Sequence, residues 1–112
     1  MSAITTHVLD TSRGCPAAGL RVELQARSGA EWKSLGIGVT DANGRCATLM
    51  GDAKPQPGGY RLLFDAGTYF KQHQTETFYS EIPIVFEIAR PEAHYHVPLL
   101  ISPFGYSTYL GS

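Results

Sequence analysis

The sequence has few cysteines, almost no net charge and no long apolar run. Cys15 and Cys46 are in no metal-ligand spacing, so we interpret each as a small, partly buried apolar residue. A net charge of -1 over 112 residues offers no electrostatic footprint for nucleic acid or an anionic membrane. No stretch is apolar over the roughly 20 residues that a membrane-spanning helix needs, and the N-terminus lacks the basic and apolar regions of a secretion signal. We therefore expect a cytoplasmic protein with no nucleic-acid or membrane partner.

Motifs of several enzyme classes are also missing. No stretch has the glycine spacing of a P-loop or of a dinucleotide-binding turn. Ser107 follows Gly-Tyr, which is not the nucleophile elbow of serine hydrolases. These absences argue against phosphate-loop chemistry and against covalent serine catalysis.

Short segments of alternating polarity, separated by turn residues, make up most of the chain. Residues 20–27 alternate apolar and polar side chains without exception. Residues 82–88 place Ile82, Ile84, Phe86 and Ile88 on the inward face, with Pro83, Val85 and Glu87 on the outward face. Seven or eight such strands predict an all-β fold, an antiparallel sandwich of two sheets, in one domain over residues 1–112. The one plausible helix, residues 66–74, is short and is expected as a surface turn. Pro83 predicts an edge position for its strand because proline cannot donate a ladder hydrogen bond.

Asp41-Ala42-Asn43-Gly44 has the residues of a tight turn. We expect a hairpin there, in which residues 31–40 lead into a strand over residues 45–50. Arg45 would then be held at the exit of the turn.

Two histidines fall on strand faces that point away from the predicted core. His7 is out of phase with Val8, and His96 is out of phase with Val97. Outward Val85, Pro98 and Leu100 mix apolar side chains with these imidazoles, which predicts a subunit interface that contains a site.

These side chains have a functional interpretation and a structural one. An imidazole with a pKa of about 6.5 can activate water, and the Arg45 guanidinium can bind planar carbonyls and stabilise negative charge. Alternatively, the same residues are ordinary polar groups on a half-exposed surface. His94 and His96 also have a metal-chelating spacing, but no carboxylate or thiolate stands at a supporting position, so we expect no metal.

Three segments carry a family resemblance. THVLDTSRGCPAAGLRVEL (residues 6–24), TDANGRC (40–46) and YHVPLLISPFGYSTYLGS (95–112) resemble, in order, the 5-hydroxyisourate hydrolases, also called transthyretin-related proteins. The resemblance implies a transthyretin-like β-sandwich and a homotetramer in which two dimers stack face to face, with active sites in the channel between them. It implies hydrolytic opening of the six-membered ring of 5-hydroxyisourate, the product of urate oxidation, without a cofactor.

The resemblance also assigns roles to residues in the matching motifs. It implies a catalytic role for His7, Arg45 and His96. It places three substrate-binding residues in the terminal tetrapeptide: Tyr109, Leu110 and Ser112. The family has arginine where this chain has Leu110, so five hydrogen-bond donors and a permanent charge are lost. That difference keeps two alternatives open, a transthyretin-like binder of small molecules and an inactive hydrolase variant.

Overall fold

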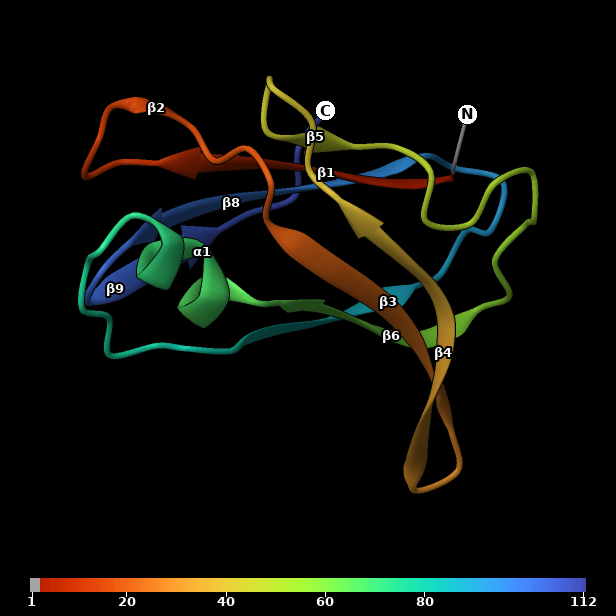
Figure 1. Cartoon of the computed structure of the whole chain (residues 1–112). Helices are drawn as coiled ribbons and strands as arrows, with labels where there is room; N and C mark the ends of the chain where they lie inside the picture. Colours follow the sequence, from red (N-terminus) through yellow and green to blue (C-terminus); the bar gives the residue numbers. More distant parts are fainter. Residues whose placement is uncertain (1–2) are drawn as a thin grey trace.

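Two β-sheets stack against each other in the computed structural model, which describes residues 3–112 (Figure 1). The five-stranded sheet contains β1 (Ile4–Asp10), β2 (Cys15–Pro16), β5 (Arg45–Cys46), β8 (Tyr95–Ser102) and β9 (Gly105–Thr108). The four-stranded sheet contains β3 (Arg21–Ser28), β4 (Glu31–Val39), β6 (Gly58–Phe64) and β7 (Ile82–Ile88). The predicted two-sheet β-sandwich is confirmed. The described residues form nine strands because β2 and β5, two residues each, add to the expected set.

Alternating side chains fill the space between the sheets. Val22 and Leu24 of β3 are fully buried, whereas Arg21 between the loop and Val22 is exposed. Val8 and Leu99 meet them from the five-stranded sheet and are also fully buried. Each such side chain contributes about 1.5–3 kcal/mol by leaving water. The core therefore fixes, by strand alternation, which residues are left for the outer faces.

The strand order brings the two ends of the chain together. β1 lies between β8 on one side and the short β2 and β5 on the other, and β9 follows β8 at the edge. The β1–β8 pair is parallel, an exception to the otherwise antiparallel pairing. In the other sheet β7 is an edge strand, as Pro83 predicted.

The prediction of a hairpin at Arg45 is wrong about which strand pairs with the segment after the turn. The turn forms, but the strand that follows is only Arg45–Cys46 and pairs with β1 in the opposite sheet, not with β4. Gly36 and Gly38 explain the crossing, because a Cβ on them would lie 2.0 Å from the Leu49 carbonyl oxygen and 2.6 Å from Cys46 Sγ. The segment after the turn thus packs against the bare backbone of β4 and does not continue its ladder. Arg45 is thereby delivered to the five-stranded sheet.

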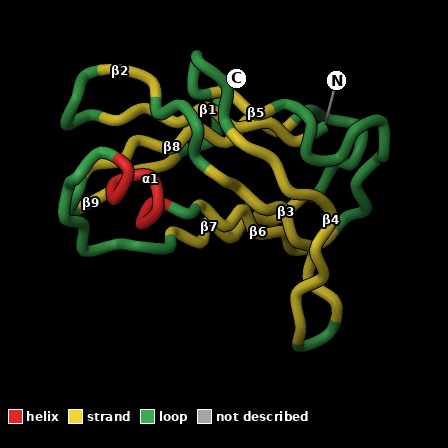
Figure 2. Tube along the Cα trace, in the orientation of Figure 1, coloured by secondary structure: helices red, strands yellow, loops and turns green. Residues whose placement is uncertain are grey.

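The helix is also more deeply placed than expected. α1 (Ala66–Gln72) closes one end of the sandwich (Figure 2), and Tyr69 and Phe70 are 2% and 1% exposed. The Tyr69 hydroxyl donates to Asp10 Oδ2 at 2.8 Å, which ties α1 to the end of β1. A surface turn is therefore the wrong description, because two aromatic side chains of this helix belong to the core.

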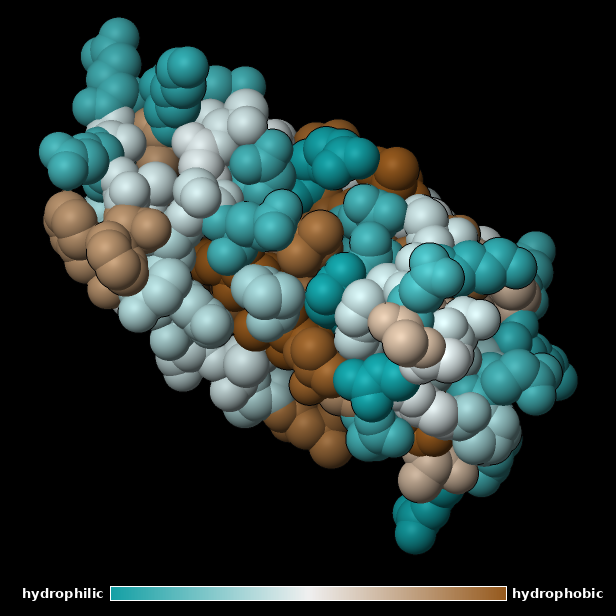
Figure 3. Space-filling view, turned by 90° about the horizontal axis from the view of Figure 1, so that it is seen from below, coloured by the Kyte–Doolittle hydropathy of each residue, from teal (hydrophilic) through white to brown (hydrophobic). Residues whose placement is uncertain are grey.

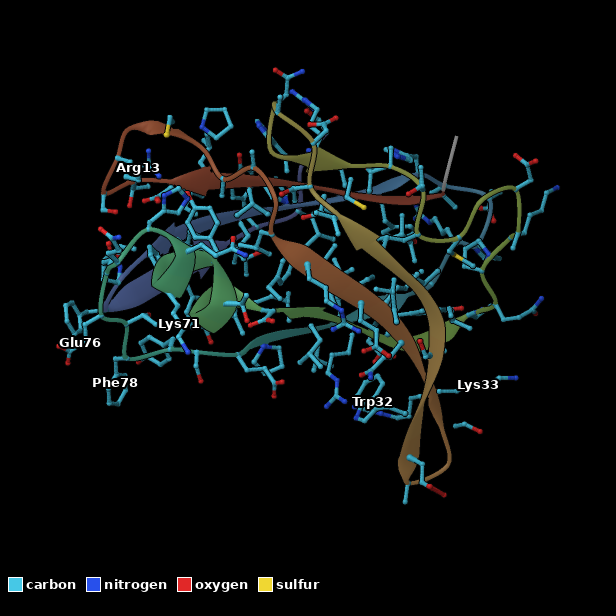
Figure 4. The ribbon with its side chains drawn as sticks, in the orientation of Figure 1. Arg13, Trp32, Lys33, Lys71, Glu76 and Phe78 are labelled. Carbon is cyan, nitrogen blue, oxygen red and sulfur yellow. The ribbon has the colours of Figure 1, made fainter. Side chains whose placement is uncertain are left out.

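The outer face of the four-stranded sheet carries exposed apolar side chains. Figure 3 views the molecule from this side, where an apolar band crosses a mainly hydrophilic surface. Ile37, Val39 and Val85 are each more than half exposed. Trp32 is on the part of the β3–β4 hairpin that projects from the body (Figure 4), and the guanidinium carbons of Arg27 and Arg61 lie 4.9 and 4.5 Å from the centroid of its ring.

Val85 therefore does not share a face with the histidines. It belongs to the four-stranded sheet, whereas His7 and His96 are on strands of the other sheet.

Within residues 3–112, no helix has the length and apolarity required to span a bilayer.

Candidate active site

The outer face of the five-stranded sheet gathers the polar residues that the sequence singled out. Along β1, Thr5, His7 and Leu9 alternate with core residues, and the register places Thr5 beside His96 of β8. On the other side of β1, His7 pairs with Arg45 of β5. Two imidazoles and a guanidinium from the beginning, middle and end of the chain thus meet on one face.

The Asp41 turn positions Arg45. The Asp41 carboxylate accepts hydrogen bonds from the backbone N–H groups of Asn43 (2.8 Å) and Arg45 (3.0 Å). These two bonds, chiefly that from Arg45, lower the pKa of the Asp41 carboxyl, so it stays ionised at neutral pH. Gly44 completes the turn at a φ of 77°, which favours glycine.

The C-terminal tail lies along β8 and reaches His96. Beyond β9, Gly111 forms an isolated bridge with His96, and its N–H donates to the His96 carbonyl oxygen at 2.8 Å. The Thr108 hydroxyl donates to the Pro98 carbonyl oxygen at 2.7 Å and anchors the tail one step earlier. A Cβ on Gly111 would lie 2.7 Å from His96 Cδ2, so only a glycine fits against the ring without a shift.

A shallow depression of about 260 Å³ opens between these elements. Its lining combines the two imidazoles with the tail and with apolar residues of β1 and β8: His7, Leu9, His96, Pro98, Leu99, Leu100, Tyr109, Gly111 and Ser112. Arg45 stands beside it, next to His7, and is not part of the lining. The volume approaches the lower limit of about 300 Å³ for small-molecule sites, so it suits a ligand the size of one or two fused rings.

Local electrostatics favour a neutral His96. Burial is the main reason that the pKa of the His96 imidazole is lowered, and the Arg45 guanidinium adds to this effect. The nearby imidazoles of His7 and His94 lower the same pKa further. The ring is therefore unprotonated at neutral pH and can accept a proton there.

A threonine that the sequence analysis passed over binds the same ring. Thr5 Oγ1 lies 2.9 Å from His96 Nδ1 and 3.2 Å from His94 Nε2. His94 and His96 therefore meet at a hydroxyl, which accounts for their alternate spacing without a metal ion. Within residues 3–112, no three histidine, cysteine, aspartate or glutamate side chains gather in a way that could hold a metal. The signal for Thr5 was its place on the His7 face of β1, but only the register reveals its neighbour.

Leu110 is separated from the imidazoles. It is 73% exposed and lines a different groove, of about 240 Å³, with Val85, Phe86 and Val97 among its neighbours. The alternation of the tail explains this, because Gly111 faces His96 and the preceding residue points to the opposite side. Of the three tail residues expected at the substrate, Tyr109 and Ser112 line the histidine depression and Leu110 does not.

Comparisons with known proteins show the family of this chain. The model of the HIUase/Transthyretin family matches residues 4–111. A 5-hydroxyisourate hydrolase of Salmonella dublin is 43% identical over 109 residues, which cover 97% of this chain and 80% of that protein. The structure of Klebsiella pneumoniae 5-hydroxyisourate hydrolase has a TM-score of 0.86 at 38% identity and covers 97% of this chain and 98% of its own.

Sea bream transthyretin, solved in complex with thyroxine, has a TM-score of 0.90 at 30% identity and covers 97% of this chain and 94% of its own. Enzymes and a hormone-bound protein thus share this fold, and the sequence identity to the enzymes is higher. By its family model, its relatives and its structure, the chain belongs to the HIUase/transthyretin family.

Proposed function

We propose that this chain hydrolyses 5-hydroxyisourate to 2-oxo-4-hydroxy-4-carboxy-5-ureidoimidazoline in urate degradation, a branch of purine metabolism. The observation that carries the proposal is the convergence of His7, Arg45 and His96 on one face, beside a depression of single-ligand size. The relatives named 5-hydroxyisourate hydrolase support this substrate.

His96 is the general base in the proposed mechanism. Its lowered pKa keeps it neutral, so it takes a proton from a water molecule that attacks the ring carbonyl. Arg45 stabilises the oxyanion as the new carbon–oxygen bond forms. His7 protonates the leaving nitrogen as the carbon–nitrogen bond of the ring breaks, which balances the proton taken up by His96. No cofactor takes part in this scheme.

The depression is open on its outer side, which supports the proposed homotetramer of two face-to-face dimers. Tyr109 is 59% exposed and Leu9 is 37% exposed at its rim. A second copy placed over this face would bury these side chains and exclude water from the site. Sedimentation equilibrium should give the mass of four chains.

Unpaired Cys15 and Cys46 support the proposed cytoplasmic location, which cell fractionation can test.

The decisive experiment generates 5-hydroxyisourate in situ with urate oxidase and follows the decay of its absorbance. The wild-type protein should accelerate this decay, and EDTA should leave the acceleration unchanged. His7→Asn and His96→Asn should abolish it. His73→Asn is the matched control, because His73 follows α1 at the other end of the sandwich and contacts Arg13. A wild-type protein that does not exceed spontaneous decay would disprove the proposal.

A second candidate is a binder of small aromatic molecules. The apolar groove lined by Leu110 favours it, as does the match to a transthyretin solved with thyroxine. Calorimetric titration with thyroxine distinguishes the two functions. Binding without hydrolysis would support the carrier, and hydrolysis without binding would support the enzyme.

A further inference from the structure

The Thr5 hydroxyl joins two imidazoles, of which the proposed mechanism uses one. Thr5 is only 6% exposed, and its oxygen lies within hydrogen-bond distance of His96 Nδ1 (2.9 Å) and His94 Nε2 (3.2 Å). A hydroxyl carries a single proton, so it can donate to only one of the two rings at a time. If one ring accepts from the hydroxyl, the other ring must donate to it for both bonds to exist. The protonation of one histidine thus restricts the protonation of the other.

We propose that Thr5 and His94 are positioning residues that hold His96 with its proton on Nδ1 and leave Nε2 free to act as the base. In this arrangement His96 Nδ1–H donates to Thr5 Oγ1, and the Thr5 hydroxyl donates to His94 Nε2. The inference deepens the proposed hydrolase function and rests on it for its catalytic consequence. The hydrogen-bond order itself is independent of any substrate.

The direction of the two hydrogen bonds follows from the charge that catalysis creates on His96. When Nε2 of His96 takes up a proton, the ring becomes an imidazolium with protons on both nitrogens. Its Nδ1–H then requires an acceptor, and the Thr5 oxygen is already oriented as one. In the reverse arrangement Nδ1 accepts the hydroxyl proton, so the single ring proton of neutral His96 is on Nε2 and that nitrogen cannot take up another. Only the proposed order serves His96 both before and after proton uptake.

His94 determines whether this order can persist. Neutral His94 offers Nε2 as an acceptor, but protonated His94 must donate from Nε2, and the Thr5 hydroxyl then turns toward His96 Nδ1. That reversal leaves the proton of neutral His96 on Nε2, where the ring cannot act as the base.

The surroundings of the two rings differ in charge. Arg45 and His7 face His96 from β5 and β1. His94 is exposed and borders a separate depression of about 400 Å³, together with Asp52, Lys54 and Glu92. Solvent therefore reaches His94 directly, whereas His96 is partly covered by the tail.

Ring nitrogen chemical shifts test the proposal directly. In histidine-labelled wild-type protein, at a pH at which both rings are neutral, NMR should show a protonated Nδ1 and an unprotonated Nε2 for His96. Thr5→Val and His94→Leu should shift the His96 population toward the Nε2–H form. Thr5→Ser and His94→Gln should keep the wild-type pattern, since serine retains the hydroxyl and glutamine retains an acceptor that does not titrate.

The rates should follow the tautomers. We expect Thr5→Val and His94→Leu to lower kcat by about tenfold with little change in KM, the size expected when one hydrogen bond to the reacting imidazole is lost. Thr5→Ser should restore kcat. Thr11→Val is the matched control, because the Thr11 hydroxyl bonds the Ile101 carbonyl oxygen of the same strand pair at 3.0 Å and does not contact His96.

Two results would overturn the inference. One is a wild-type His96 with its proton on Nε2, and the other is a Thr5→Val variant with the wild-type tautomer and kcat. If Thr5→Val does not fold, the His94→Leu variant, which changes an exposed residue, tests the inference by the same tautomer and kcat measurements. If the wild-type protein has no hydrolase activity, the proposed function fails, whereas the NMR result still decides the hydrogen-bond order.

Discussion

Gly111→Ala should misplace His96 without unfolding the protein. The added Cβ would lie 2.7 Å from His96 Cδ2 and 3.1 Å from Pro98 Cγ, where ordinary contacts begin at 3.4 Å. The ring or the tail must therefore move by about 0.7 Å, the difference between 3.4 and 2.7 Å. Thr5 holds the ring through Nδ1, and the Gly111 N–H holds the tail to the His96 carbonyl oxygen, so either movement disturbs a hydrogen bond.

The expected cost is larger in catalysis than in stability. Loss of one peripheral backbone hydrogen bond lowers the free energy of unfolding by about 1 kcal/mol. Displacement of a reacting group by a fraction of an ångström to one ångström lowers kcat by about 10- to 100-fold. The assay is the decay of 5-hydroxyisourate at saturating and limiting substrate, alongside a urea unfolding curve.

Gly105→Ala is the matched control for this experiment. Its Cβ would meet Ser102 Oγ at an ordinary 3.7 Å, and neither glycine has a positive φ, so backbone strain does not enter the comparison. Wild-type kcat in Gly111→Ala would refute the reasoning. An equal loss in both variants would also refute it, because the effect would then be general to the β8–β9 hairpin.

Three further changes test the neighbouring arguments. Leu110→Arg should raise kcat/KM because the longer side chain, placed in a groove that shares Tyr109 with the histidine depression, adds donors for substrate oxygens. The stability change should stay within about 0.5 kcal/mol at this exposed position, and an unchanged kcat/KM would contradict the account. Arg45→Gln should lower kcat by about a hundredfold. Because it removes a positive charge that lowers the pKa of His96, it should also move the acid limb of the kcat/KM profile to higher pH. An unmoved limb would show that this limb does not report the titration of His96. Tyr69→Phe should lower the free energy of unfolding by about 1.5–3 kcal/mol because a buried bond to Asp10 is lost, whereas Tyr79→Phe should not. The pKa of Tyr69 is raised from 10.0 to about 12, so its contribution to stability should be complete below pH 10 and should fall as the pH rises toward 12, as urea titrations at each pH would show.

Strand alternation made much of this fold predictable. A period of two assigns each residue of a strand to one face, so the core positions of β3 and β7 and the outward direction of His7 and His96 follow from the sequence. The edge position of Pro83 follows from its missing N–H. These are local properties, and they hold whichever strand lies alongside.

The pairing between strands could not be predicted from the sequence. Arg45 belongs to the five-stranded sheet because Gly36 and Gly38 leave room for the crossing segment, a contact between chain segments that no local pattern displays. Thr5 meets His96 because β1 and β8 are parallel and in a particular register. Both facts depend on contacts between residues far apart in the sequence, which a single sequence does not encode in any readable period.

The register of the tail also changes the significance of Leu110. The sequence suggested that leucine in place of arginine would decide between an active and an inactive enzyme. In the structure, the neighbouring Gly111 contacts His96, while Leu110 points into the groove that contains Val97. The arrangement of the imidazoles and Arg45 is therefore formed without any contribution from residue 110. A leucine there can weaken the hold on substrate, but it does not displace the groups that perform the chemistry, so its effect should fall on KM more than on kcat.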